Sequence, residues 1–219
     1  MFTKHQQSHP PRGANLPRRP ERANGVRRYE QLLDAAERLL TSESADDLTI
    51  QKLAREAGVP MASVYHFFPG PGAISVALSE RYMAGFAALV GQPIAGRKAQ
   101  PWERIVATLM DRTVSFYREH PYAQKLVLGS DHSWAIRQSD LANNRALAEP
   151  IVSLIGDKFD NVPDDVLREA VVVGISIGDA VYTLSIAEQG EITPAYAQEA
   201  VIAVCAYLSA RFPASAKID

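Results

Sequence analysis

The segment 48–68, LTIQKLAREAGVPMASVYHFF, carries polar side chains whose types suit contact with nucleic acid: Lys52, Arg55, Ser63, Tyr65 and His66. Basic side chains neutralise phosphates, and hydroxyl and imidazole groups can hydrogen-bond to phosphates or base edges. The apolar residues between them recur at helical spacing, which predicts two short helices, 50–57 and 60–67, joined by a turn at Gly58. Such a pair can form a helix-turn-helix, in which the first helix supports the second against the DNA major groove. An ordinary helical hairpin would show the same pattern.

The elements that must position this motif are also predicted to be helices. Apolar residues at three- and four-residue spacing predict a helix from residue 26 to about 41 and another over 73–90. Further helices are expected over 102–120, 122–128, 134–159, 164–189 and 193–212. Pro150 should interrupt or bend one of them. No alternating strand pattern occurs, so the predicted fold class is all-α, with a three-helix N-terminal domain followed by a helical C-terminal domain.

The charge of the chain is distributed unevenly along the sequence. The formal net charge is -2, which by itself argues against a nucleic-acid partner. The first 28 residues, however, contain seven basic side chains and one acidic side chain and carry +6. Arg27 and Arg28 are therefore candidates for phosphate contacts, whereas the preceding arm is either a further DNA contact or a solvated tail. The predicted organisation is a flexible basic arm at 1–25, a helix-turn-helix domain with its linking helix at 26–90, and a helical domain at 91–219.

Composition places the chain among globular proteins, because 47% hydrophobic and 22% charged residues exclude a wholly disordered chain. The single cysteine, Cys205, cannot form an internal disulfide, and no apolar run of a signal peptide follows the basic N-terminus. These features predict a cytoplasmic protein. The stretch 170–187 approaches the length of a membrane span, but Asp179 in its middle would be costly in lipid. We therefore expect a buried or interface helix and no membrane partner.

The first ninety residues contain motifs with characteristic spacing: Ala35-Ala36 and Leu39 in the first helix, then LTI at 48–50, LAREAGV at 53–59 and SVYHFF at 63–68. In these motifs, residues 28–90 resemble the DNA-binding domain of the TetR-like (tetracycline-repressor) family of transcriptional regulators. Residues 91–219 resemble the family only in helix layout. The resemblance implies a ligand-responsive DNA-binding regulator, a repressor released from a palindromic operator by a small apolar or aromatic effector.

The resemblance assigns roles to individual positions. The segment 60–67 corresponds to the recognition helix, and its candidate groove-contacting residues are Met61, Ala62, Ser63 and His66. Tyr65 corresponds to the family's common phosphate-contacting tyrosine. Thr49 corresponds to a cap at a helix N-terminus that faces phosphate, where free N–H groups and the helix dipole favour an anion. The implied partners are a double-stranded DNA operator, a second copy of the chain and a small-molecule effector.

Two positions depart from the family pattern. Pro60 stands where many members have serine or a similar cap, and Pro71 stands where a lysine usually opens the next helix on the phosphate backbone. The segment 60–67 contains no Lys or Arg, so an arginine fork on guanine cannot be made from it. Base contacts would rest on Ser63, His66 and apolar contact with thymine methyl groups. Phosphate neutralisation would rest on the basic residues outside this helix, namely Lys52, Arg55, Arg27, Arg28 and the arm.

The C-terminal domain is expected to bind the effector and to dimerise. Candidate effector-contacting residues are Met110, Arg112, Phe116, Tyr117, His120, Trp134, Asp179 and Tyr182. Asp179 is the strongest candidate, because a carboxylate in so apolar a helix needs a hydrogen-bond partner or a ligand. In the resembling family the last two helices form a four-helix bundle with those of a second copy; the candidate interface residues are Val171, Ile175, Gly178, Val201, Val204 and Leu208. The same stripes could instead close the core of one chain.

The sequence contains none of the common catalytic or cofactor motifs: GxGxxG, P-loop, HExxH, paired cysteines or GxSxG. Asp131-His132-Ser133 has the residue types of a catalytic triad, but adjacent residues do not form one without special geometry. We therefore expect no enzyme activity, no cofactor and no metal. The alternative hypothesis is a helical small-molecule-binding or scaffold protein with lost or weak specific DNA binding.

Overall fold

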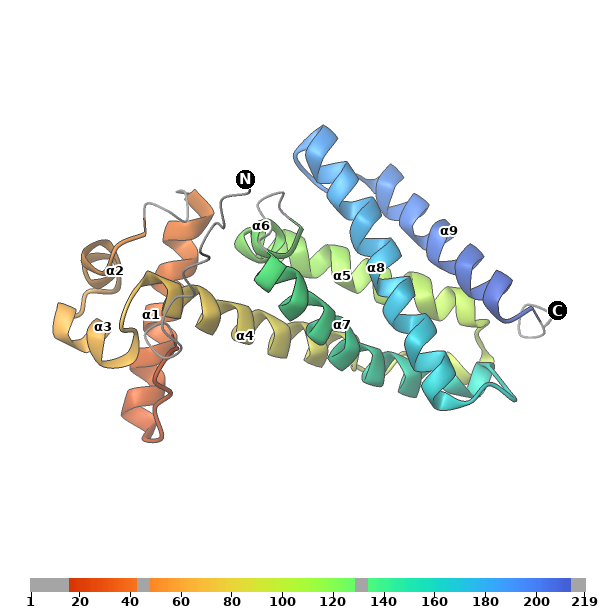
Figure 1. The fold of residues 1–219 in the computed structure, drawn as a ribbon, viewed down its shortest axis with the longest axis horizontal. Coiled ribbons are helices and arrows are strands. Elements are labelled where there is room, and N and C mark those ends of the chain that lie inside the picture. Colours follow the sequence, from red (N-terminus) through yellow and green to blue (C-terminus); the bar gives the residue numbers. More distant parts are fainter. Residues whose placement is uncertain (1–15, 43–47, 129–133, 214–219) are drawn as a thin grey trace, which may run out of the picture. The chain divides into compact units, whose positions relative to one another are not determined.

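The computed structural model describes residues 16–42, 48–128 and 134–213, with the backbone alone for residue 42 and for 134–142. Every regular element in these ranges is a helix, which confirms the predicted all-α class (Figure 1). The chain divides into two compact units, Met1–Arg81 and Tyr82–Asp219. The division falls inside a helix rather than in the predicted linker after residue 90.

The first unit contains α1 (Ala23–Ser42), α2 (Ile50–Ala57), α3 (Met61–Phe67) and the beginning of α4 (Pro71–Val90). Its core consists of fully buried side chains from all four helices: Leu32, Leu33, Leu53, Val64 and Ile74. The Tyr29 ring packs against the rings of Phe67 and Phe68, with centroids 5.7 and 5.0 Å away. The apolar spacing seen in the sequence therefore corresponds to the buried faces of these helices.

The turn of the helix-turn-helix is determined by residues at its helix ends. The Thr49 hydroxyl accepts a hydrogen bond from the Lys52 amide at 3.2 Å and caps the N-terminus of α2. Gly58 ends α2 with φ of 64°, a left-handed conformation that favours glycine. Pro60 precedes α3 in an extended conformation and supplies no side-chain cap. The departure noted at Pro60 thus leaves the N-terminus of α3 without the usual side-chain hydrogen bond.

The segment 16–22, predicted as part of a flexible arm, packs on the first unit. The Arg18 amide donates to the Phe67 carbonyl at 2.8 Å, and Arg19 forms an ion pair with Glu80 at 2.7 Å. The first helix begins at Ala23, three residues earlier than predicted. Residues 1–15 of the predicted arm lie outside the described part of the chain. The arm prediction is therefore wrong for 16–22, because a backbone hydrogen bond anchors this segment to the end of α3.

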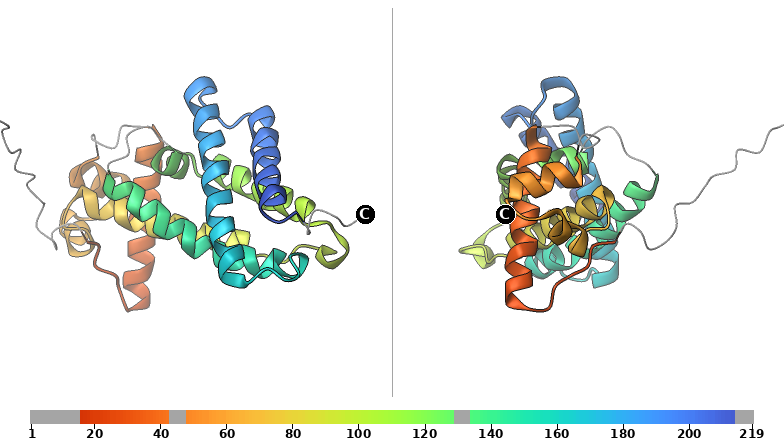
Figure 2. Two further views of the ribbon diagram at one scale, coloured as in Figure 1. Left: turned by 45° about the vertical axis from the view of Figure 1, so that its right-hand side comes forward. Right: turned by 90° about the vertical axis from the view of Figure 1, so that its left-hand side faces the viewer.

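The second unit contains the C-terminal half of α4 and five further helices: α5 (Trp102–Glu119), α6 (Pro121–Leu128), α7 (Trp134–Ile155), α8 (Asp164–Gln189) and α9 (Pro194–Arg211). Short 3-10 helices occupy Arg97–Ala99 and Gly156–Lys158. The two last helices, α8 and α9, lie side by side (Figures 1 and 2). The helix α7 continues through Pro150, where the sequence predicted an interruption or a bend.

Two described helices, α4 and α8, are long and apolar enough to cross a membrane by length and composition. Both helices contain charged residues, among them Arg81 in the middle of α4 and Asp179 within the apolar stretch of α8. Arg81 forms ion pairs with Glu30, Asp34 and Glu37 of α1, and α8 packs against α7 and α9. These contacts are those of core helices in a folded domain, as predicted for the stretch 170–187.

Arg112, predicted as an effector contact, instead terminates α4. Its guanidinium donates to the carbonyls of Leu89, Val90, Gln92 and Pro93 at 2.8 to 3.4 Å. The last carbonyls of a helix have no partner within the helix, and a positive charge there is favoured by the helix dipole. The structure therefore corrects the assignment of Arg112, whose role is to hold the end of α4 against α5.

Replacing Arg112 by alanine should lower the free energy of unfolding by about 1–2 kcal/mol, because several charged hydrogen bonds to half-buried carbonyls are lost. The matched control is Arg104→Ala on the same helix, where the side chain is exposed. Urea denaturation followed by circular dichroism measures both variants. Equal stability of the two variants would contradict the capping role.

Candidate nucleic-acid interface and ligand cavity

The outer face of α3 presents the side chains that were predicted to enter the DNA groove. Met61 and Tyr65 are 44% and 47% exposed, and Ala62 and His66 are also exposed. On the opposite face, Val64 and Phe67 are buried in the core of the unit. Contiguous exposed apolar patches often mark interaction sites, and Met61 and Tyr65 lie one helical turn apart on this face, so its composition is compatible with a contact surface.

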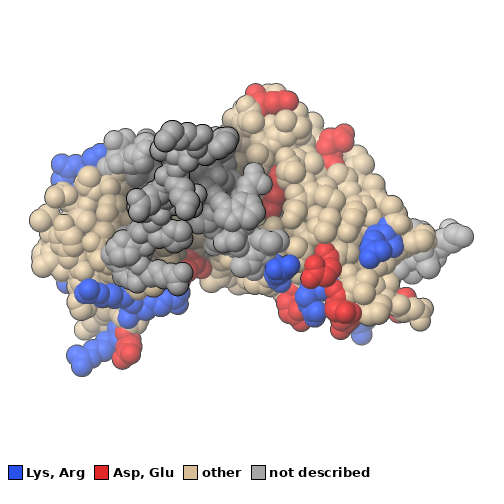
Figure 3. Space-filling view, viewed as in Figure 1, with Lys and Arg blue, Asp and Glu red and all other residues tan. Residues whose placement is uncertain are grey.

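The N-terminal end of α1 lies beside α3 and brings basic residues to the same surface. Arg28 donates to the Ser63 hydroxyl at 3.5 Å, and Arg27 donates to the Asn24 side chain at 2.6 Å. An open groove runs between the two helices, lined by Asn24, Gly25, Arg27, Arg28, Gln31, Ala62, Ser63, His66 and Phe67. Figure 3 shows basic side chains gathered at this end of α1. The predicted DNA-contacting residues from two separate segments therefore share one surface.

The remaining predicted DNA-binding residues lie on α2 and at its N-terminus. Thr49 is exposed and caps the helix, as the resemblance implied, and Lys52 is half-buried. Arg55 is exposed near the C-terminal end of α2. Thr49 is therefore placed where an anion at the helix N-terminus would be favoured.

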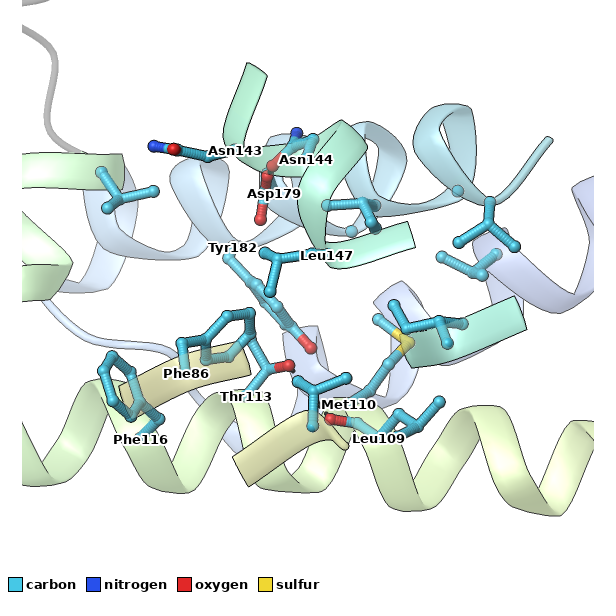
Figure 4. A pocket seen from close by; sticks show the side chains of 18 of the residues that line it. Phe86, Leu109, Met110, Thr113, Phe116, Asn143, Asn144, Leu147, Asp179 and Tyr182 are labelled. Carbon is cyan, nitrogen blue, oxygen red and sulfur yellow. Dashed lines mark hydrogen bonds between the residues drawn. The ribbon is translucent and has the colours of Figure 1, made fainter. Parts of the chain in front are cut away.

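The second unit encloses a cavity of about 110 Å³ among α4, α5, α6, α7, α8 and α9 (Figure 4). Its walls are almost entirely apolar and include the aromatic rings of Phe86, Phe116 and Tyr117. The predicted effector contacts that line it are Met110, Phe116, Tyr117, Asp179 and Tyr182. An enclosed apolar space with few polar groups is the usual form of a small-molecule site.

Two polar features of the cavity come from the same helix, α8. Asp179 is half-buried, and the Asn144 side chain donates to its carboxylate at 3.5 Å. Tyr182 is 2% exposed, and its hydroxyl has no hydrogen-bond partner among the described residues. Burial raises the pKa of the Tyr182 phenol, and the carboxylates of Asp179 and Asp111 raise it further, so the phenol stays protonated at neutral pH. A buried hydroxyl without a partner carries a desolvation cost that a bound ligand could relieve.

Two other effector candidates do not line the cavity. His120 packs its ring against Phe116 and Tyr82, with centroids 4.7 and 5.5 Å away, at the end of α5. Arg112 is occupied with the carbonyls at the end of α4. The structure does not support the prediction that these residues orient a ligand in this cavity, because the His120 ring is packed against other rings and the Arg112 guanidinium is hydrogen-bonded to backbone carbonyls. The side chain of Trp134 lies outside the described residues.

The predicted dimer stripe lies inside a single chain. Four of its residues are buried: Val171, Gly178, Val204 and Leu208. Ile175 lines the cavity, and Val201 is half-buried. A Cβ at Gly178 would lie 3.2 Å from the Met110 Cε atom, so the absence of a side chain there admits Met110. The burial of these four residues supports the alternative interpretation, in which the two apolar stripes close the core of one chain.

The sequence did not indicate the contribution of α4 to the cavity. Tyr82, Met83, Phe86 and Val90 line it from the C-terminal half of this helix. Asn143 and Asn144 on α7 were also missed. The apolar spacing of residues 82–90 was visible, but spacing alone does not show whether a face packs on other helices or borders an empty space.

Two family models match the chain. "Bacterial regulatory proteins, tetR family" matches residues 32–73, and "Tetracyclin repressor-like, C-terminal domain" matches residues 100–212. The second model alone spans more than half of the chain, and the first contains the helix-turn-helix. No match was found among curated proteins.

Solved structures of the same fold cover most of the chain. A TetR-family transcriptional regulator from Streptomyces coelicolor is 22% identical with a TM-score of 0.68, over 85% of this chain and 98% of that one. SmeT, the repressor of the Stenotrophomonas maltophilia multidrug efflux pump SmeDEF, is 15% identical with a TM-score of 0.59, over 83% and 88%. A SmeT–triclosan complex is 15% identical with a TM-score of 0.60, over 84% and 91%. The two family models and the helix-turn-helix geometry together show that the chain belongs to the TetR family of transcriptional regulators.

Proposed function

We propose that this TetR-family regulator is a cytoplasmic repressor that binds a palindromic operator as a homodimer and is released by a small apolar or aromatic effector. The observation that carries the proposal is the outer face of α3, where Met61, Ala62, Tyr65 and His66 are exposed beside the basic end of α1. Such a surface combines groove-reading groups with phosphate-neutralising groups.

In this proposal, α3 reads bases without a basic residue. Ser63 and His66 hydrogen-bond to base edges, and Met61 and Ala62 contact thymine methyl groups. Because such contacts are individually modest, affinity depends on phosphate neutralisation by the basic residues around the helix: Arg27, Arg28, Lys52 and Arg55. Tyr65 and the N-terminus of α2 at Thr49 add further phosphate contacts.

The effector acts through α4 in this proposal. Four residues in the C-terminal half of α4 line the cavity, and Arg81 in the same helix is paired with acidic residues of α1. A ligand that favours a different position of this helix would therefore change the equilibrium between DNA-binding and non-binding states. The solved SmeT–triclosan complex, which has a similar fold, supports small-molecule binding within this fold.

We place the proposed dimer surface on the outer face of the last two helices, α8 and α9, because the predicted stripe is largely buried within one chain. Val173 and Leu184 on α8 and Ile202 on α9 are exposed large apolar side chains. Two copies that bury these residues against each other would present two recognition helices to a palindromic site. The proposed dimer is still the four-helix bundle that the family resemblance implies, but its contacts are made by Val173, Leu184 and Ile202 instead of the predicted stripe.

Replacing Arg28 by alanine should weaken binding to the DNA that flanks the protein's own gene and reduce the slope of log affinity against log salt by about 1. The physical reason is the loss of one phosphate contact. Fluorescence anisotropy over a salt series measures the slope, and Arg145→Ala, an exposed arginine in the second unit, is the charge-matched control.

The same measurement includes a scrambled DNA of equal length. Equal affinity of the unaltered protein for both DNAs would favour the alternative function, a helical ligand-binding or scaffold protein with weak specific DNA binding. An unchanged salt slope in Arg28→Ala would show that Arg28 does not contact phosphate.

Introducing a charge on the outer face of α8 should dissociate the dimer. Leu184→Glu buries an unpaired carboxylate in the proposed interface, which is strongly unfavourable. Analytical ultracentrifugation should give a monomer for Leu184→Glu and a dimer for Leu16→Glu, which places the same charge on an exposed leucine of the first unit. A dimer that survives Leu184→Glu would place the interface elsewhere.

A further inference from the structure

The cavity in the second unit has a single charged group in its lining. Among the described residues that line it, Asp179 is charged and no Lys, Arg or His is present. Asn143 and Asn144 lie at the same end of the cavity (Figure 4). A carboxylate bordered by apolar walls favours a positively charged group and disfavours an anion, because charge interactions are stronger where water is excluded.

The body of the cavity suits one aromatic ring. The rings of Phe86 and Phe116 pack with centroids 5.2 Å apart, and the soft thioether of Met110 lies in the same lining. Aromatic and thioether side chains make favourable edge and face contacts with a further ring. An engineered apolar cavity of about 150 Å³ accepts benzene. The 110 Å³ found here is close to this size and limits the enclosed part of a ligand to about one ring.

A second polar group lies away from the carboxylate. Figure 4 shows the Tyr182 ring directed away from Asp179, toward Thr113 and Met110. Its hydroxyl is buried and has no hydrogen-bond partner among the described residues, whereas the Thr113 hydroxyl donates to the Leu109 carbonyl at 3.0 Å. A hydroxyl left in this state is ready to bond to a polar atom at the inner end of a ligand.

We infer that the cavity binds a small aromatic amine, with its protonated amine at Asp179, its ring packed against the side chains of Phe86, Phe116 and Met110, and a ring hydroxyl at Tyr182. The inference rests on the proposed function, since it assigns a chemical class to the effector of the same cavity. Selectivity comes from the charge at one end, because the apolar walls contact the ring, which is the same in neutral, cationic and anionic compounds of this shape, whereas Asp179 offsets the desolvation cost of a cation alone.

Four probes of similar shape separate these contributions: tyramine, 2-phenylethylamine, 2-phenylethanol and phenylacetate. Isothermal titration calorimetry on the full-length protein without DNA should give affinities that decrease in this order. The amine should bind about tenfold or more tightly than the alcohol, because a charge-assisted hydrogen bond is exchanged for a neutral one. Phenylacetate should bind most weakly, because its carboxylate would face Asp179.

Two isosteric variants test the two polar ends. Asp179→Asn should remove the preference for 2-phenylethylamine over 2-phenylethanol, and retained binding of the alcohol would show that the cavity remains folded. Tyr182→Phe should make tyramine and 2-phenylethylamine bind equally. Preserved selectivity in Asp179→Asn, equal binding of amine and alcohol by the unaltered protein, or no binding of any probe would overturn the inference. A tyramine preference that persists in Tyr182→Phe would overturn the assignment of the inner hydroxyl.

The measurements are independent of operator binding. Failure of all probes, with specific DNA binding intact, would reject this ligand class and leave the regulator function standing. Binding of the amines, with no preference for the flanking DNA over a scrambled DNA, would support the ligand class and reject the proposed DNA function.

Discussion

The burial of α4 is the constraint on which the rest of the structure depends. Its first half contributes Ala73, Ile74, Ala77 and Leu78 to the core of the first unit, and its second half contributes Tyr82 and Val90 to the second. Because one continuous helix supplies apolar surface to both units, neither unit can be completed without it. The boundary therefore falls within the helix, and the predicted linker after residue 90 lies inside the second unit.

The middle and the C-terminal end of α4 are held by charged side chains that the apolar pattern does not reveal. Arg81 is paired with acidic residues of α1, and Arg112 binds carbonyls at the C-terminus of the helix. These interactions lie at the two ends of the segment 82–90 that borders the cavity. In the proposed mechanism, a ligand in the cavity acts on this helix segment, whose two ends are held by ion pairs and hydrogen bonds.

The surface around α3 and the cavity differ in charge: basic side chains lie beside α3, whereas the charged residue in the described cavity lining is Asp179. The helix α3 carries no Lys or Arg, so in the proposed function the basic residues of α1 and α2 supply the attraction for phosphate. The lining of the cavity is mostly apolar and includes the Asp179 carboxylate and the buried Tyr182 hydroxyl, so it gains from a ligand that carries complementary polar groups. The -2 net charge of the chain conceals this division, because the basic end of α1 is offset by acidic residues elsewhere.

The sequence by itself determined the all-α class and the helix-turn-helix with its turn at Gly58, because helical periodicity and turn chemistry are local properties of the chain. The family followed from the resemblance of the motifs in residues 28–90, and the family models confirm it. It also singled out Asp179, as a carboxylate on an apolar helix, and Tyr182, as an aromatic residue, and both line the cavity. Only the tertiary structure decided that Arg112 caps α4, that the stripe containing Val171 and Val204 faces the interior, and that residues 16–22 are anchored. The physical reason is that periodicity shows which face of a helix is apolar. What that face meets depends on helices distant in the sequence.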